Sequence, residues 1–234
     1  MEFMGKIVAM GGGFSGEYAW DLAEKLIAET GKKCPNYLAI PTTCYDEGSG
    51  DTGIYSKMGC ECHILKLTDP CFTEETIAKL IREADLINVP GGNLKFCMDV
   101  WNRTNASKYL KEAYDRGAIL FGQSSGSMCW FKQGFDDCGP RGDFMFIDCL
   151  DLIPFNNVPH YEGDFWHQFD EYAAKTPLST ICCENDTAFV CDNGKYSIMI
   201  CPKKPDARVW YFDAKDNYKR HDLVAEPELL ENLR

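Results

Sequence analysis

The sequence is poor in positive charge and in long apolar runs. Its 234 residues include 24 lysines and arginines against 36 aspartates and glutamates, which gives a formal net charge of −12. A charge of this sign disfavours binding to nucleic acid or to an anionic membrane surface. No apolar run approaches the length that spans a bilayer, and no apolar core of a secretory signal opens the chain. We therefore expect a cytoplasmic protein with no nucleic-acid or membrane partner.

Cysteine is plentiful, but its spacing indicates neither a disulfide framework nor a metal site. The 13 cysteines are an odd number and are scattered, so we interpret them as reduced thiols. Cys60, Cys62 and His63 lie too close together within one expected strand to supply a tetrahedral ligand set, and Cys182-Cys183 is a poor partner pair. We expect no metal and no other cofactor.

Short apolar runs alternate with helical patterns over the first 130 residues. The expected strands are residues 6–10, 37–40, 62–67, 86–89 and 118–121, and the expected helices cover residues 19–27, 77–84 and 105–116. Such alternation is typical of a mostly parallel sheet with helices on both faces. We predict one α/β domain over residues 1–234, since a chain of this length buries a sizeable core.

The last third of the chain has a different pattern. Residues 188–192 and 195–200 flank Asn193-Gly194, which is a strong signal for a hairpin of the type I′ kind. Residues 209–212 predict one more strand. We expect these strands to extend the same sheet as an antiparallel C-terminal addition.

Gly122-Gln123-Ser124-Ser125-Gly126 lies between the expected strand at 118–121 and a helical pattern that begins near residue 127. Gly-x-Ser-x-Gly in this context is the nucleophile-elbow pattern. The glycines relieve crowding at a sharp turn, so that the central hydroxyl projects into a cleft. We predict Ser124 as the nucleophile and the Ser125 N–H as a donor to an oxyanion. The alternative is a small-residue loop that closes a strand.

Histidine is scarce, so the search for a base is short. Of the four histidines, His63 alternates within an expected strand, His167 lies in an apparent helix and His221 lies in a charged stretch. His160 follows Pro159 downstream of the serine, where a rigid loop can aim an imidazole. The pairing of a serine nucleophile with a neighbouring base therefore favours His160.

The carboxylate that would orient this imidazole is open among Asp136, Asp137 and Glu162. The two aspartates lie in the expected loop after the Ser124 helix, whereas Glu162 is two residues from His160. The order Ser124, Asp137, His160 matches the nucleophile–acid–base order of elbow hydrolases. We therefore predict Asp137 as the acid, with Asp136 and Glu162 as alternatives.

Two glycine-rich turns follow other expected strands. Residues 11–16 fit Gly-x-Gly-x-x-Gly, but dinucleotide binding also requires an acidic residue after the second strand, and the chain has Pro41-Thr42-Thr43 there. We expect these glycines to permit a close strand-to-helix turn. Pro90-Gly91-Gly92-Asn93 lies at the same edge and is expected to supply a second oxyanion donor.

Taken together, these motifs resemble the S51 serine peptidases, a family that includes aspartyl dipeptidase (peptidase E) and cyanophycinase. In that family Gly-Gly-Asn, Gly-x-Ser-Ala-Gly and Pro-His-Phe/Tyr occur in the order of Gly91-Gly92-Asn93, the Ser124 motif and Pro159-His160-Tyr161. The resemblance implies a fold like that of class I glutamine amidotransferases. It also implies Ser124 as nucleophile, His160 as base, Asp137 as the orienting acid, and an oxyanion hole made by the N–H groups of Gly92 and Ser125. Ser125 stands where the family usually has alanine.

The sequence thus predicts a serine hydrolase that cleaves small peptides with a Ser-His-Asp type triad. One rival is an α/β-hydrolase-type esterase, whose base would be His221 near the C-terminus. Another is a non-catalytic binding protein that holds a nucleotide or metabolite on the loops at 11–16 and 91–93. The oligomeric state is open, and a homodimer is compatible with the sequence.

Overall fold

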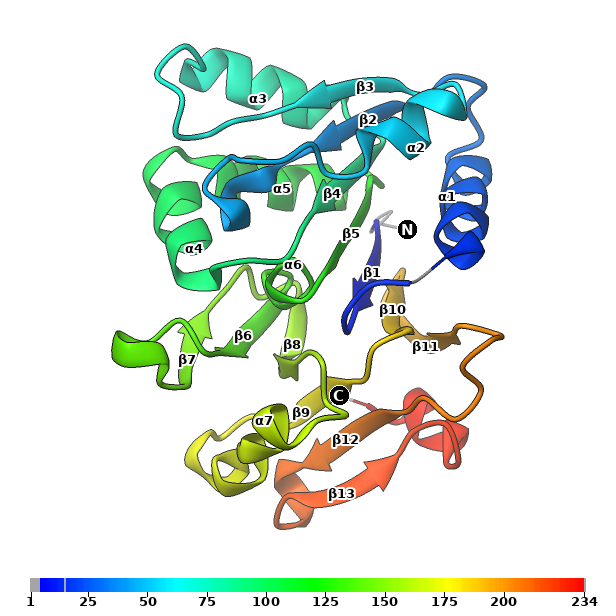
Figure 1. Cartoon of the computed structure of the whole chain (residues 1–234), viewed down its shortest axis with the longest axis vertical. Coiled ribbons are helices and arrows are strands. Elements are labelled where there is room, and N and C mark those ends of the chain that lie inside the picture. The colour runs from blue at the N-terminus through cyan, green and yellow to red at the C-terminus, as the bar shows by residue number, and fades with distance from the viewer. Residues whose placement is uncertain (1–4, 15, 234) are drawn as a thin grey trace.

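The computed structural model describes residues 5–14 and 16–233. The chain folds into two β-sheets with helices packed around them (Figure 1). The strand order of the first sheet is β11 (Lys195–Ile200), β10 (Thr187–Asp192), β1 (Lys6–Met10), β5 (Ile119–Gln123), β4 (Leu86–Val89), β2 (Asn36–Ala39) and β3 (Glu61–Ile64). Strands β1 to β5 pair in parallel, and β10 and β11 pair antiparallel at one edge. The expected parallel sheet with an antiparallel hairpin is confirmed.

Helices cover both faces of this sheet because its strands alternate between two apolar clusters. Ile7 and Ala9 of β1 pack into the cluster that contains the apolar faces of α3 (Glu74–Glu83), α4 (Leu94–Arg103) and α5 (Ala106–Asp115). Val8 and Met10 pack into the opposite cluster, with α1 (Glu17–Glu29) and α2 (Thr52–Lys57). Successive side chains of a strand point to opposite faces, so one apolar strand fills both layers.

The predicted hairpin between β10 and β11 is also confirmed. Asn193 has φ 49° and Gly194 has φ 75°, which is the positive-φ pair that a type I′ turn requires. Strand β11 is the edge strand of the sheet, and several of its side chains are partly exposed.

A second sheet was not predicted. Its strand order is β13 (Lys219–Asp222), β12 (Val209–Asp213), β9 (Thr180–Cys183), β8 (Ile153–Val158), β6 (Phe131–Asp136) and β7 (Met145–Asp148). The expectation that residues 209–212 extend the first sheet is wrong, because β12 pairs with the buried strand β9. The expected helix after Ser124 is a single turn, α6 (Ser125–Met128), and β6 follows at once.

One cluster of buried side chains runs across both sheets. Phe189 of the first sheet contacts Phe131 and Phe155 of the second, with ring centroids 6.2 and 6.5 Å apart. The other face of the second sheet carries a smaller aromatic cluster that includes Phe135 and Phe169, near the short helix α7 (Asp164–His167). Within the described residues, no helix combines the length and apolarity needed to cross a bilayer.

The loops that carry the predicted site residues follow parallel strands of both sheets. In the first sheet β1, β5, β4 and β2 lead into Gly11, Ser124, Pro90 and the 3₁₀ turn η1 (Pro41–Cys44). In the second sheet β6, β8 and β9 run parallel to one another and lead into the loops that begin at residues 137, 159 and 184. Carboxyl ends of parallel strands are where α/β proteins place their binding sites.

Candidate active site

Ser124 occupies a strained position between β5 and α6. Its backbone has φ 55° and ψ −128°. Residues other than glycine rarely adopt this conformation, which costs on the order of 1–3 kcal/mol. A Cβ at Gly122 or Gly126 would overlap the carbonyl oxygen of Val89 on β4. The turn can therefore lie this close to β4 only because glycines flank the serine.

The glycine turn at 11–13 lies against Ser124. The Ser124 N–H donates to the carbonyl oxygens of Gly11 at 3.0 Å and Met10 at 3.2 Å. A Cβ at Gly12 would overlap the Asn185 side chain and lie 2.8 Å from His160 Nδ1. Ser124 and His160 thus border the same turn, and Gly12 faces His160 and Asn185. Ser15, within the predicted Gly-x-Gly-x-x-Gly motif, lies outside the described residues.

His160 is held by Asn185. Its Nδ1 lies 2.7 Å from Asn185 Oδ1, and because an amide oxygen can only accept, Nδ1 carries the proton. The Nε2 lone pair is then free to accept a proton. Within residues 5–14 and 16–233 no hydrogen bond joins Nε2 to Ser124 Oγ, a contact that often tightens only once substrate is bound.

Two neighbours fix this pair. Glu162 Oε2 accepts the backbone N–H of Asn185 at 2.8 Å, and the Trp166 ring lies 5.5 Å from the His160 ring, centroid to centroid. His160 itself has φ 53°, and its carbonyl accepts the Glu162 N–H at 2.8 Å. The imidazole is therefore oriented through a short exposed segment rather than through the buried core.

The structure gives the imidazole a different partner from the predicted acid. Asp136, expected in a loop, is the last residue of β6 and is buried, and burial and the neighbouring Asp137 raise its pKa. Glu162 reaches the imidazole only through Asn185. Among the described residues, neither aspartate forms a hydrogen bond or an ion pair with His160. The residue beside His160 Nδ1 is Asn185, because the loop after β9, and not the end of β6, reaches the imidazole.

Asn185 was missed because its signal is weak. It lies 25 positions beyond His160, in the polar stretch Glu184-Asn185-Asp186 after the apolar residues of β9. A polar stretch directly after a buried parallel strand is the signal that points to it. That signal is readable only once β9 is recognised as a strand.

The two predicted oxyanion donors lie on adjacent loops. The Ser125 hydroxyl donates to the carbonyl oxygen of Gly92 at 2.6 Å, which ties the turn after β5 to the loop after β4. Gly92 has φ 142°, and a Cβ there would overlap the backbone of Thr43. Among the described residues, neither the Gly92 nor the Ser125 N–H donates a hydrogen bond, so both remain available to a ligand.

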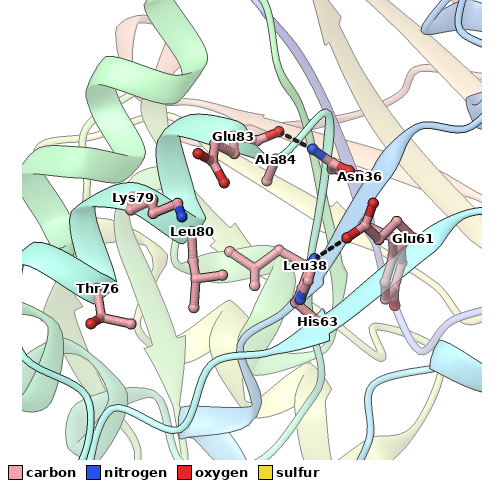
Figure 2. Close-up of a pocket in the computed structure, with 10 residues that line it drawn as sticks. Asn36, Leu38, Glu61, His63, Thr76, Lys79, Leu80, Glu83 and Ala84 are labelled. Atoms are coloured by element: carbon pink, nitrogen blue, oxygen red, sulfur yellow. Dashed lines mark hydrogen bonds and ion pairs between the residues drawn. The ribbon is translucent and has the colours of Figure 1, made fainter.

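The remaining histidines have other partners. His221 lies on the edge strand β13, and its Nδ1 is 3.1 Å from Glu226 Oε2. His167 Nε2 lies 3.2 Å from the Tyr161 carbonyl oxygen. His63 pairs with Glu61 at 3.3 Å in a pocket of about 370 Å³ between β2, β3 and α3, which Figure 2 shows. None of the residues around Ser124 line that pocket.

Metal ligands do not cluster in the part of the chain that the structure describes. No group of three or more histidine, cysteine, aspartate or glutamate side chains there is arranged to hold a metal ion. Within the same residues, none of the 13 cysteines forms a disulfide.

Comparison with known proteins identifies a family. The model of the family described as peptidase family S51 matches residues 7–199. The uncharacterized peptidase YgaJ of Bacillus subtilis (strain 168) is 28% identical over 166 residues, which are 69% of this chain and 70% of that protein. The uncharacterized peptidase Lmo0363 of Listeria monocytogenes is 28% identical over 115 residues, which are 45% of this chain and 56% of that protein.

Two solved structures share the fold. A peptidase from an acI-B1 actinobacterium superposes with a TM-score of 0.74 at 18% identity, over 95% of both chains. A putative peptidase E protein from Listeria monocytogenes EGD-e superposes with a TM-score of 0.64 at 17% identity, over 85% of this chain and 99% of that one. These likenesses confirm the predicted α/β fold of the class I glutamine amidotransferase type.

Proposed function

This chain belongs to peptidase family S51, and on that premise we propose that it cleaves small peptides with Ser124, His160 and Asn185. The coarser assignment, a serine peptidase, follows from the family. The single observation that carries the finer one is the 2.7 Å hydrogen bond between His160 Nδ1 and Asn185 Oδ1 beside the turn that holds Ser124. It leaves Nε2 as the basic atom of an oriented imidazole.

In the proposed first half-reaction Ser124 Oγ attacks the scissile carbonyl while His160 Nε2 takes the hydroxyl proton. The positive φ of Ser124 between β5 and α6 supports a nucleophile elbow, in which the hydroxyl stands clear of the turn. The Gly92 and Ser125 N–H groups receive the developing oxyanion. Asn185 keeps the imidazole in the tautomer that this step needs.

The proton on His160 then passes to the leaving amine, and the peptide bond breaks to leave an acyl group on Ser124, which completes the first half-reaction. In the second half-reaction water attacks the acyl group while His160 takes its proton; the bond between the acyl group and Ser124 Oγ then breaks, and His160 returns the proton to Oγ. An asparagine whose Oδ1 faces Nδ1 favours the same tautomer as an aspartate, but it adds no charge to stabilise the imidazolium.

Neither rival gains support from the geometry. The esterase alternative requires His221 as base, and His221 is bonded to Glu226 on the edge strand of the second sheet. The binding-protein alternative leaves the strained Ser124 and the His160–Asn185 pair without a role.

A substrate panel tests the proposal. Free dipeptides with acidic, basic and apolar first residues, N-blocked peptides and simple esters are offered to wild type and to Ser124→Ala. We expect hydrolysis of at least one class of short peptide by wild type, and none above background by Ser124→Ala.

Circular dichroism and the melting temperature Tm should not distinguish the two proteins, because the Ser124 hydroxyl makes no hydrogen bond within the described residues. Turnover by a folded Ser124→Ala sample would remove Ser124 as nucleophile. Hydrolysis of esters alone would favour the esterase, and hydrolysis of nothing would favour the binding protein.

A further inference from the structure

Side chains hold the loop that carries the Gly92 donor. Each of its three carbonyl groups accepts a hydrogen bond from a side chain: Pro90 from Thr43 Oγ1 at 2.7 Å, Gly91 from Cys44 Sγ at 2.8 Å, and Gly92 from Ser125 Oγ at 2.6 Å. The Gly92 N–H shares its peptide group with the Gly91 carbonyl, and its position depends on how these donors hold the loop. Ser125 is the one among them that also belongs to the Ser124 turn.

The Ser125 hydroxyl faces two acceptors but has one proton. Besides the Gly92 carbonyl oxygen at 2.6 Å, it lies 3.1 Å from Asp136 Oδ2. The same Oδ2 accepts the Leu94 N–H at the start of α4, at 3.2 Å. If the hydroxyl proton is given to Gly92, the contact between Ser125 and Asp136 is a hydrogen bond only when the carboxyl itself carries a proton.

Asp136 is well placed to keep that proton. It is 1% exposed, and burial, followed by the neighbouring Asp137 carboxyl, raises its pKa to about 7, against the smaller opposing effects of Ser125 and the Leu94 N–H. The other titratable neighbours are the thiols of Cys138 and Cys149.

These neighbours do not supply a counter-charge. Burial raises the pKa of both the Cys138 and the Cys149 thiol, so both are neutral near pH 7. Lys95, which follows Leu94 on α4, is engaged by Asp99 at 2.8 Å. A negative charge on Asp136 is therefore stabilised mainly by hydrogen bonds from the Leu94 N–H and the Ser125 hydroxyl.

We propose that Ser125 and Asp136 are positioning residues of the oxyanion hole, in which protonated Asp136 donates to Ser125 Oγ and Ser125 donates to the Gly92 carbonyl. The inference rests on the proposed function and deepens it. When Asp136 ionises, the carboxylate becomes the stronger acceptor and draws the Ser125 proton to itself. The Gly92 carbonyl then loses its side-chain donor, and the loop that carries the Gly92 N–H is held less firmly against the Ser124 turn.

The expected signature is a loss of reactivity as the pH rises through the ionisation of Asp136. The reaction of Ser124 with a fluorophosphonate that has no titratable group reports the nucleophile and the oxyanion hole together. We expect the second-order labelling rate, corrected for hydrolysis of the probe, to fall about 10-fold above about pH 7, a part of the 10²–10³ that a lost oxyanion donor costs.

Two variants separate this effect from ionisations elsewhere. Ser125→Ala should lower the rate several-fold at about pH 6 and abolish the fall above it, because the hydroxyl that links Asp136 to the Gly92 carbonyl is gone. Asp137→Asn should keep the fall but move it to lower pH, because a like charge that raises the pKa of Asp136 is gone. Asp148→Asn, an exposed acid of β7 bonded to Gln133, is the charge-matched control and should keep the wild-type profile.

The outcomes are distinct. A fall that persists unchanged in Ser125→Ala, or that does not move in Asp137→Asn, overturns the positioning role while leaving Ser124 as nucleophile. An overall loss in Asp137→Asn of about 10⁴-fold at every pH would instead make Asp137 the triad acid. Wild type that never labels overturns the proposed function and this inference with it. If Ser125→Ala does not fold, the shift in Asp137→Asn decides alone.

Discussion

Buried side chains hold the turn of Ser124 and the proposed oxyanion donors, whereas exposed side chains hold His160. Ser125 and Asp136 are 2% and 1% exposed and join three segments, the turns after β5 and β4 and the end of β6. Asn185 and Glu162 are both exposed and sit on loops after β9 and β8. One half of the site is preorganised by the core, and the other is held by single hydrogen bonds at the surface.

This difference predicts unequal costs of substitution. A rigid, desolvated donor stabilises the transition state without reorganisation, so its loss is expensive. An exposed hydrogen bond competes with water and contributes about 1 kcal/mol. Changes on the serine side should therefore reduce turnover more than changes on the histidine side.

The largest of these effects is expected for Gly92→Ala. Its φ of 142° is unfavourable for alanine, and the new Cβ would overlap the Thr43 backbone, so the oxyanion donor moves. We expect kcat to fall by about 10²–10³, with the Michaelis constant KM much less affected, in steady-state assays on the best peptide of the panel. Gly53→Ala, where a Cβ meets nothing, is the control. Equal activity of the two variants would show that Gly92 supplies no donor.

Asn185→Ala should cost about 5-fold in kcat/KM, since it removes one neutral hydrogen bond to His160 Nδ1 worth about 1 kcal/mol. Asn185→Asp keeps the acceptor and adds a charge that stabilises the imidazolium, so it should be at least as active as wild type. A silent Asn185→Ala would contradict the assignment of Asn185.

A smaller effect is expected for Glu162→Gln. Glu162 holds the backbone N–H of Asn185, and a glutamine oxygen can still accept that bond. We expect kcat/KM to fall no more than about 3-fold, within the range of an exposed interaction. A loss larger than that of Asn185→Ala would mean that Glu162 acts on His160 directly.

The smallest effect concerns stability rather than turnover. The pKa of Asp136 is raised from 3.8 to about 7, so the folded protein keeps a proton that the unfolded chain releases above about pH 4. The contribution of this group to stability is therefore present at low pH and is lost as the pH rises from about 4 to about 7. The difference in Tm between Asp136→Asn and wild type should therefore increase in favour of the variant, by a few degrees, as the pH rises over that interval. A constant difference in Tm would show that Asp136 does not titrate there.

The same contrast separates what the sequence could predict from what it could not. Ser124, Gly92 and His160 lie in short motifs that fix their own backbone, so the strand–turn context was readable, as was the Asn193-Gly194 hairpin. The second sheet could not be predicted from the sequence, because β12 pairs with β9, and the hairpin of β10 and β11, which belongs to the first sheet, separates these two strands in the chain. Without β9 there was no reason to place Asn185 beside His160, and Asp137 was predicted from chain order alone.

Asp136 shows a related limit. The sequence placed it in a loop, where an aspartate is hydrated and ionised. Its burial at the end of β6, under Ser125 and against the start of α4, comes from pairing between segments distant in sequence. The role of Ser125 in place of alanine is visible only once this carboxyl is located.

The central claim, that Ser124 is the activated nucleophile of a serine peptidase, is tested most directly by mapping a covalent adduct. Wild type is treated with a fluorophosphonate at about pH 7, digested, and the modified peptide is sequenced by tandem mass spectrometry. We expect one adduct, on Ser124, that is absent from Ser124→Ala and slow to form in Asn185→Ala. An adduct on Ser125 or Ser127, or a wild-type protein that stays unmodified while it hydrolyses peptides, would contradict it.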